Sequence, residues 1–269
     1  MPTIPGRHFV RNSITKRNLL YQLVRRDFHQ RFIGSAGGWL WGFIQPLILI
    51  LSWVFVFQIC LHNKVPPGET TNNYTIWLAC GYLPFMLFQE TLTRSVSSMV
   101  DNSNLITKTV FPAEFIPVAV FLSTLVQHLL ALSIVLAALM FIFRHASFWM
   151  AALPFYMVML GLFAIGIAWV VASLQVYLRD TAQVLTLVLT FWFWTTPIFI
   201  SEKQYPVWTH WVLRLNPLAY LVRAYRDRLL SSRVPSLQEI SMITLYSCAA
   251  FILGGLFFRQ LKRGFADVL

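Results

Sequence analysis

Long apolar runs separated by short polar links dominate the pattern of the chain. Each run approaches the roughly 20 apolar residues that a helix needs to cross a bilayer. The links hold charged or helix-breaking residues, such as the Pro66-Pro67-Gly68 triplet after the first run. The pattern predicts an all-α integral membrane fold with six transmembrane helices. The six runs cover residues 39–61, 74–92, 115–143, 148–178, 184–200 and 240–258.

The segment before the first run has a different pattern, typical of a basic amphipathic helix. Its apolar residues recur at intervals of three and four, with arginines between them. We therefore divide the chain into an N-terminal cytoplasmic amphipathic segment, 1–38, and a six-span transmembrane domain, 39–269. The segment could serve only anchoring and topology, or it could receive an anionic lipid headgroup, which requires at least two converging arginines. The apolar positions are Leu20, Leu23, Val24, Phe28 and Phe32.

The link between the fifth and sixth runs, 201–238, also has internal structure. Asn216-Pro217 marks a turn, and apolar residues recur at helical spacing after it. Arg223, Arg226 and Asp227 fall largely between these positions, which predicts an amphipathic helix in the interface or dipping back into the membrane. Upstream, Trp208 and Trp211 indicate a second such helix anchored at the headgroup level. We interpret the pair as a surface hairpin, and a lid over the outer end of a pathway is the alternative.

Composition and charge narrow the class of protein. The chain is 57% hydrophobic and 12% charged, against about 25% charged residues in soluble domains. This composition excludes a soluble enzyme. The net charge is +11, and in a membrane protein such an excess collects on the cytoplasmic side. The Lys and Arg distribution favours cytoplasmic termini, although the link 201–238 holds most of the positive charge on the other side. Lipid phosphates, and not nucleic acid, are the expected partner of these charges.

The motifs of nucleotide hydrolysis and hydrolytic catalysis are missing from the sequence, which contains no Walker A, GxGxxG, HExxH or GxSxG pattern. Nearly all carboxylates lie at the ends of the runs, and Glu90, which comes closest to a mid-membrane position, still lies near the end of its run, so ion-coupled transport is disfavoured. Cys60, Cys80 and Cys248 lie far apart without CxxC spacing. We expect a non-enzymatic chain that binds no metal or cofactor itself and draws energy from outside.

Aromatic residues are the most informative feature of the runs. The fifth run contains the quartet 191–194, with the sequence FWFW, and the first run is also rich in Trp and Phe. Consecutive helical residues point about 100° apart, so at most two members of the quartet can line one cavity. Aromatic side chains can be lipid-facing bulk, or they can offer faces on which sugar rings stack while sliding. The second interpretation is retained for the first and fifth runs together.

The order and spacing of several short motifs resemble one known family over nearly the whole chain. The chain resembles the membrane subunit of ABC-2 type polysaccharide exporters, which move lipid-linked O-antigen, capsule or teichoic acid polymers. One departure is Ala36-Gly37-Gly38, where the family has a bulkier residue before the second glycine. The motifs are LVRRD (23–27), RFIGS (31–35), GYLPF (81–85), NSNLITKTVFP (102–112), YLRD (177–180), TPI (196–198), NPL (216–218) and RGFAD (263–267).

The resemblance implies an assembly and roles for individual residues. Two copies of the chain would form one pathway, each bound to a separate ABC ATPase that holds ATP and Mg²⁺. The paired helices between the fifth and sixth spans would form an extracytoplasmic gate. Lipid headgroups would enter beside Arg25, Arg26 and Arg31. Aromatic side chains lining the channel would be Phe43, Trp53, Phe191, Trp192 and Trp194. The coupling helix on the ATPase would use Asp101, Asn102, Leu105, Ile106 and Lys108.

The resemblance also implies a function and a location. The expected function is ATP-driven export of a lipid-linked polysaccharide, with O-antigen as the first expectation, across a bacterial inner membrane with both termini cytoplasmic. Alternatives are an ABC-2 exporter of capsule, teichoic acid, drugs or lipids, an integral-membrane enzyme acting on lipid-linked sugar, and a passive channel.

Overall fold

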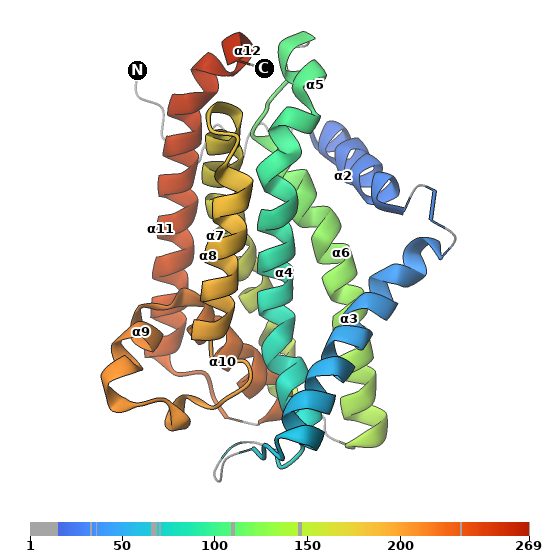
Figure 1. Cartoon of the computed structure of the whole chain (residues 1–269), viewed down its shortest axis with the longest axis vertical. Coiled ribbons are helices and arrows are strands. Elements are labelled where there is room, and N and C mark those ends of the chain that lie inside the picture. The colour runs from blue at the N-terminus through green and yellow to red at the C-terminus, as the bar shows by residue number, and fades with distance from the viewer. Residues whose placement is uncertain are drawn as a thin grey trace.

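The computed structural model describes residues 16–32, 34–35, 37–65, 69, 71–108, 111–144, 147–231 and 233–268. Within these ranges every regular element is a helix, and the helices form one bundle (Figure 1). The Pro66-Pro67-Gly68 triplet, Ile33, Ala36 and residues 109–110 of the NSNLITKTVFP motif lie outside the described residues, as does the Lys108 side chain.

The longer helices run along the bundle and the short ones cover its two ends. In chain order they are α2 (Arg17–Phe32), α3 (Trp41–Trp53), α4 (Tyr74–Asp101), α5 (Ser103–Lys108), α6 (Phe115–Ala137), α7 (Leu153–Tyr177), α8 (Thr181–Thr195), α9 (His210–Leu215), α10 (Pro217–Leu230), α11 (Leu237–Leu261) and α12 (Phe265–Val268). Helices α2, α5 and α12 lie at one end, here called the α5 end (Figure 1). Helices α9 and α10 lie at the opposite end, here called the α10 end.

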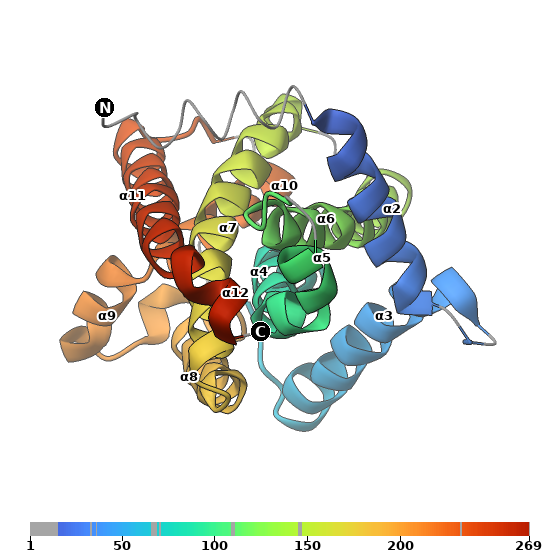
Figure 2. The same ribbon diagram turned by 90° about the horizontal axis from the view of Figure 1, so that it is seen from above.

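Helix α4 is the centre of the bundle. It contacts α6, α7, α8 and α10, and the view from above shows it surrounded by its neighbours (Figure 2). Most of its residues from Tyr74 to Met99 are buried. Because α4 is shielded by other helices, it can carry polar residues such as Gln89, Glu90 and Arg94 that a lipid-facing helix could not carry without high cost.

Four helical stretches are long and apolar enough to cross a membrane: Trp41–Cys60, Phe115–Ile142, Phe148–Tyr177 and Leu237–Gly264. Helix α8 is apolar but shorter. Helix α4 has 28 residues, but its polar and aromatic residues lower its mean hydropathy. The prediction of an all-helical membrane protein is confirmed. The two further spans that the sequence analysis expects, at 74–92 and 184–200, stay predictions.

Helices α3 and α6 end in the same unusual way. Each widens into a π-helical segment, Val54–Cys60 after α3 and Ala138–Ile142 after α6. Each then stops at a residue with positive φ, His62 at 53° and Arg144 at 49°. π-helical turns are uncommon and cluster at functional positions. At both places the long helix ends and the chain passes into a link.

The tightest helix contact joins α7 and α11. A Cβ atom added to Gly254 would lie 2.0 Å from the Gly166 carbonyl oxygen, and one added to Gly166 would lie 2.3 Å from the Ala250 carbonyl oxygen. The two backbones therefore touch. Small residues of this kind allow close packing between helices in a membrane, where burying apolar surface gives little driving force.

Candidate functional site

Polar links fix helix α2 to the bundle at the α5 end. Asp27 of α2 forms a 2.7 Å ion pair with Arg94 of α4. The Arg94 Nη1 atom donates to Ser123 Oγ of α6 at 3.0 Å, and Ser123 in turn donates to Asp27. Arg31 pairs with Glu90 of α4, and Arg26 donates to Asn102 Oδ1. These links hold α2 against both α4 and α6.

The three arginines predicted to receive a lipid headgroup have different surroundings. Arg25 is exposed. Arg26 is exposed but donates a hydrogen bond to Asn102. A residue of the predicted headgroup set thus contacts a residue of the predicted coupling segment. Arg31 is half-buried beside Glu90, and burial lowers its pKa while the Glu90 carboxylate opposes that change. Arg25 is therefore the member of the set that is most open to a ligand.

The predicted coupling segment forms the short helix α5, directly after the end of α4. Asp101 is exposed, and Asn102 caps α4 and donates to the Ser98 carbonyl oxygen at 2.8 Å. Leu105 packs on the cluster of Leu23, Phe115 and Ala119, while Ile106 packs on the main core. Helix α5 is thus attached to α2, α4 and α6 through its apolar side.

The aromatic quartet 191–194 divides into two faces. Trp192 and Phe193 point into the bundle, where Trp192 lies 5.1 Å from Phe88 and Phe193 lies 5.1 Å from Phe85, measured between ring centres. Phe191 and Trp194 are 72% and 59% exposed. No more than two members of the quartet therefore point in one direction, as the helix geometry predicts. Phe191 and Trp194 share the outer face.

Trp53 joins the first run to the fifth. Its ring centre lies 4.5 Å from Tyr82, 5.4 Å from Phe193 and 5.1 Å from Phe199. Phe43, one turn before Pro46 in α3, is half-buried. The structure thus brings Trp53 together with the inner face of α8. Phe193, Phe199 and Tyr82 complete this aromatic cluster, and none of the three is among the predicted channel residues.

Large apolar side chains remain exposed on both α3 and α8. In a bundle of this composition such faces contact lipid or another protein surface. On α3 and its π-helical extension they are Trp41, Ile44, Leu47, Ile48, Leu49, Leu51, Phe55, Val56 and Ile59. On α8 they are Val184, Leu187, Val188, Phe191 and Trp194.

The chain unwinds after α8, and side chains from other helices satisfy its free carbonyl groups. Arg226 of α10 donates to the Pro197 carbonyl oxygen at 2.6 Å and to that of Ile198 at 2.5 Å. Tyr74 of α4 donates to the Phe199 carbonyl oxygen at 2.8 Å. Buried backbone groups at a helix end need such partners. The unwound segment is therefore tied to α4 and α10 together.

Arg226 is buried, with only 7% of its surface exposed. Its guanidinium lies over the Trp77 ring and its Nε atom donates to the Trp77 carbonyl oxygen at 3.2 Å. Burial lowers its pKa to about 10, so the group keeps its charge at neutral pH. The expectation that Arg226 lies on a polar face of this helix is wrong, because its side chain is buried, and Arg228 is buried as well. The surface-hairpin interpretation is wrong for α10, which packs on α4, α7 and α11.

Asn216, in the NPL motif, connects α10 to α8. Its Oδ1 atom accepts from the Leu218 backbone N–H at 3.0 Å and from Trp192 Nε1 at 2.8 Å. Its Nδ2 atom donates to Thr196 Oγ1 at 3.1 Å. Upstream of α9, Glu202 accepts two bonds from Arg223 of α10. The elements of the α10 end thus form one connected unit around the end of α8.

Comparison with known proteins gives one consistent result. A family model described as ABC-2 type transporter matches residues 18–230. A protein of Klebsiella pneumoniae called O-antigen export system permease protein RfbA is 28% identical over 255 residues, covering 94% of this chain and 95% of the relative. A Myxococcus xanthus protein of the same name is 25% identical and covers 96% and 98%. Polysialic acid transport protein KpsM of Escherichia coli is 22% identical and covers 86% and 89%.

Proposed function

The chain belongs to the ABC-2 type transporter family, and on that premise we propose that it is the membrane subunit of an ATP-driven exporter of a lipid-linked polysaccharide, with O-antigen as the cargo. The similarity to proteins called O-antigen export permeases over almost the full length of both chains carries this choice. Capsule polysaccharide is the second candidate, supported by the lower identity to KpsM. Drugs, small lipids, teichoic acid and enzymatic activity on lipid-linked sugar have no comparable support.

In this proposal the α5 end faces the cytoplasm of a bacterium, and the inner membrane surrounds the bundle. Six helices, α3, α4, α6, α7, α8 and α11, then cross the bilayer, and α9 and α10 form a gate on the far side. The four apolar stretches support this arrangement. So do the exposed Trp208, just before α9, and Trp211, within α9, because such residues collect at the headgroup level.

Two copies and two ATPase subunits form the working exporter in this proposal. The ATPase supplies the bound ATP and Mg²⁺, and this chain holds no cofactor. The exposed apolar faces of α3 and α8 turn toward the second copy and the polymer path. Phe191 and Trp194 stand on that face, so their rings can stack on sugar rings without strong directional bonds.

Helix α5 is the docking element for the ATPase in the same proposal. Movement there reaches α4 through Asn102 and reaches α2 through the Arg26–Asn102 bond. Headgroups of the lipid-linked polymer then contact Arg25 on the exposed side of α2. At the other end α4 carries Trp77 against Arg226, so the same helix can move the gate.

Complementation in bacteria tests this function. The chain and its neighbouring ATPase gene are expressed in a strain that makes O-antigen but lacks its own O-antigen export permease and ATPase. We expect O-antigen to return to the cell surface, detected by antibody on intact cells. A partner ATPase with its catalytic glutamate changed to glutamine is the control and should restore nothing. Return of capsule alone in a matching capsule-export strain would reject O-antigen as the cargo.

A further inference from the structure

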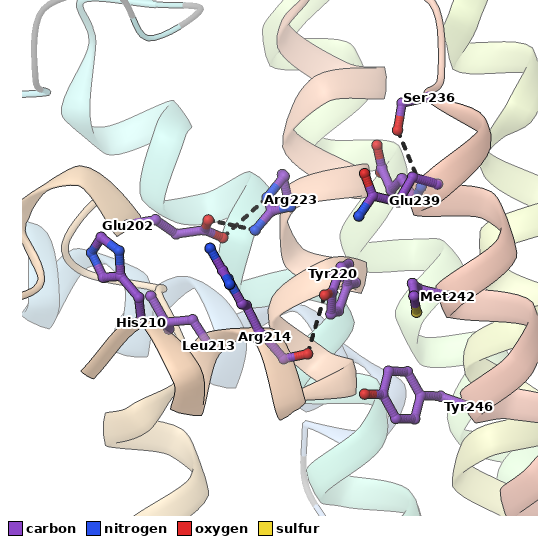
Figure 3. Close-up of a pocket in the computed structure, with 11 residues that line it drawn as sticks. Glu202, His210, Leu213, Arg214, Tyr220, Arg223, Ser236, Glu239, Met242 and Tyr246 are labelled. Carbon is purple, nitrogen blue, oxygen red and sulfur yellow. Dashed lines mark hydrogen bonds and ion pairs between the residues drawn. The ribbon is translucent and has the colours of Figure 1, made fainter. Parts of the chain in front are cut away.

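A pocket of about 740 Å³ lies at the α10 end, between the segment around α9, helix α10 and the first turns of α11 (Figure 3). This volume is within the range of about 300–1,000 Å³ that is typical of small-molecule sites. None of the residues that line the pocket belongs to the Trp53 aromatic cluster. Its lining combines cationic, acidic and aromatic side chains, among them Arg214, Glu239 and Tyr246.

One buried acidic group lines this pocket, and one of its two carboxylate oxygens has no bonding partner among the described residues. Glu239 is 8% exposed, and its Oε1 atom has no hydrogen-bond partner among the residues that the structure describes. Asp227, Arg228, Arg223 and Glu202 all lie close enough to act on this carboxylate electrostatically, and neither arginine donates to Oε1. A buried carboxylate oxygen is costly without a donor. Because Glu239 lines the pocket, its carboxylate is the acceptor that the pocket offers to a ligand ammonium or hydroxyl group.

A cation stands at the opposite side of the same pocket. Arg214 is exposed, and it forms no ion pair within the described part of the chain. Arg223, in contrast, is occupied by its two bonds to Glu202. Figure 3 shows the Arg214 side chain beside this pair, with the Tyr246 hydroxyl facing the same space. Arginine is well suited to phosphate because its fork of donors matches the phosphate oxygens.

The position of the pocket favours an amphiphile over a soluble ligand. Glu239 lies near the start of the apolar stretch Leu237–Gly264, and Tyr246 lies about 10 Å further along the helix axis. Beyond Tyr246, α11 exposes Leu253 and other large apolar side chains. Trp211 of α9, next to the lining residue His210, is 62% exposed, as expected for a headgroup-level anchor. Acyl chains can therefore lie along α11 while a headgroup fills the pocket.

We propose that this pocket binds a phospholipid with a zwitterionic phosphoethanolamine headgroup, its phosphate at Arg214 and its ammonium at Glu239. The assignment of this lipid to the outer leaflet rests on the proposed function, but the binding chemistry does not. A bound lipid would brace α9 and α10 against α11 from the membrane side.

Native mass spectrometry of the purified full-length chain tests the proposal with two probes, phosphatidylethanolamine and phosphatidylcholine. Both carry a phosphate, but choline has no hydrogen-bond donor. We expect the wild type to retain phosphatidylethanolamine about tenfold better, as the loss of one charge-assisted hydrogen bond implies. Glu239→Gln should abolish this preference, and Arg214→Gln should weaken both lipids. Arg144→Gln, an exposed arginine at the same end, is the matched control and should change neither.

Three results would overturn the proposal. The first is equal retention of the two lipids by the wild type. The second is unchanged binding in Arg214→Gln, a variant whose exposed side chain is not needed for folding. The third is displacement of the lipid by soluble polysaccharide in the wild type but not in the variants, which would make the pocket a glycan site. The binding measurement needs neither ATP nor export. A chain that retains the lipid but exports no polymer would therefore reject the proposed function and leave the lipid proposal standing.

Discussion

The guanidinium of Arg226 lies 3.5 Å from the centre of the Trp77 ring and joins the α10 end to the central helix α4. The same helix ends at Asp101, and Asn102 caps it at the α5 end. Trp77 and Asn102 are therefore about 37 Å apart along one continuous helix axis, at 1.5 Å per residue. A displacement at either end of α4 is carried to the other end without passing through a loop.

Loss of the Arg226 guanidinium should release α10 from α4 and from the unwound segment after α8. In Arg226→Gln, the Pro197 and Ile198 carbonyl groups lose their donors. Removing charge-assisted bonds of this kind costs about 3 kcal/mol. We expect a lower thermal unfolding midpoint in detergent, and leak of a small fluorophore from vesicles that contain the exporter.

Two further variants separate the charge from the fork geometry. Arg226→Lys keeps the charge but lacks the forked guanidinium that bonds both carbonyl groups. Its unfolding midpoint and its leak should therefore lie between those of the wild type and of Arg226→Gln. Arg233→Gln changes an exposed arginine just after α10 and should behave as the wild type. Equal midpoints and equal leak in Arg226→Gln and Arg233→Gln would contradict the role of Arg226.

Neighbouring glycines on α11 should differ sharply in their tolerance of alanine. A Cβ atom at Gly254 would lie 2.0 Å from the Gly166 carbonyl oxygen, whereas one at Gly255 would lie 3.4 Å from the Trp169 ring. Gly254→Ala must separate α7 from α11, and Gly255→Ala needs no backbone movement. We expect Gly254→Ala to lose several kcal/mol of stability, on the order of other overpacking variants. Thermal unfolding of both purified variants measures the difference, and similar midpoints would show that the close contact is absent.

The sequence predicts the helical runs well because span length is a property of local hydropathy. The boundaries of α6 and α7 follow the apolar runs at 115–143 and 148–178 closely. It does not reveal that α4 is the central helix, because burial between protein helices relaxes the need for apolar residues and lowers the hydropathy signal. Nor can it show the α7–α11 contact, since Gly166 and Gly254 meet only in one helix register.

The sequence predicts less of the candidate site than of the helices. The periodic pattern correctly predicts a helix after Asn216-Pro217, and it puts Arg226 among polar positions. The pattern cannot show that a helix end at Thr196 leaves carbonyl groups that need a donor, which is why Arg226 is buried. The geometry of consecutive residues does predict the division of the quartet 191–194. Which two members turn inward depends on the packing of α8 on α4.

Variants of the arginines of α2 should distinguish headgroup binding from a mechanical link between α2 and α4. Arg25 is exposed, whereas Arg26 is bonded to Asn102. If arginines receive the polymer's headgroup, Arg25→Ala alone should reduce export, and Arg25→Ala with Arg26→Ala should reduce it further, with normal membrane insertion. If Arg26 acts through the bond to α4, Asn102→Ala should reproduce Arg26→Ala. Surface polymer per unit of inserted protein is the measurement, and full export by the double arginine variant would reject the headgroup role.

The last prediction concerns Trp192 and Trp194, which are two residues apart on α8 and differ in burial. Trp192 packs on Phe88 and donates to Asn216, so Trp192→Ala removes core packing and a bond at the start of α10. Its cost should be about 3–5 kcal/mol of stability. Trp194 is 59% exposed and its ring stacks on Phe199, so Trp194→Ala should lower the unfolding midpoint much less than Trp192→Ala does.

Export should respond differently from stability. If the outer face of α8 lines the polymer path, Trp194→Ala slows export at unchanged protein level, because a stacking surface for sugar rings is lost. Trp194→Phe keeps an aromatic face and should restore most of the rate, while Val188→Ala, also exposed on α8, should have little effect. The measurement is the rate at which polymer reaches the surface after synthesis is induced. An unchanged rate in Trp194→Ala would assign this face to lipid, because a lipid-facing side chain can lose its ring without affecting the polymer.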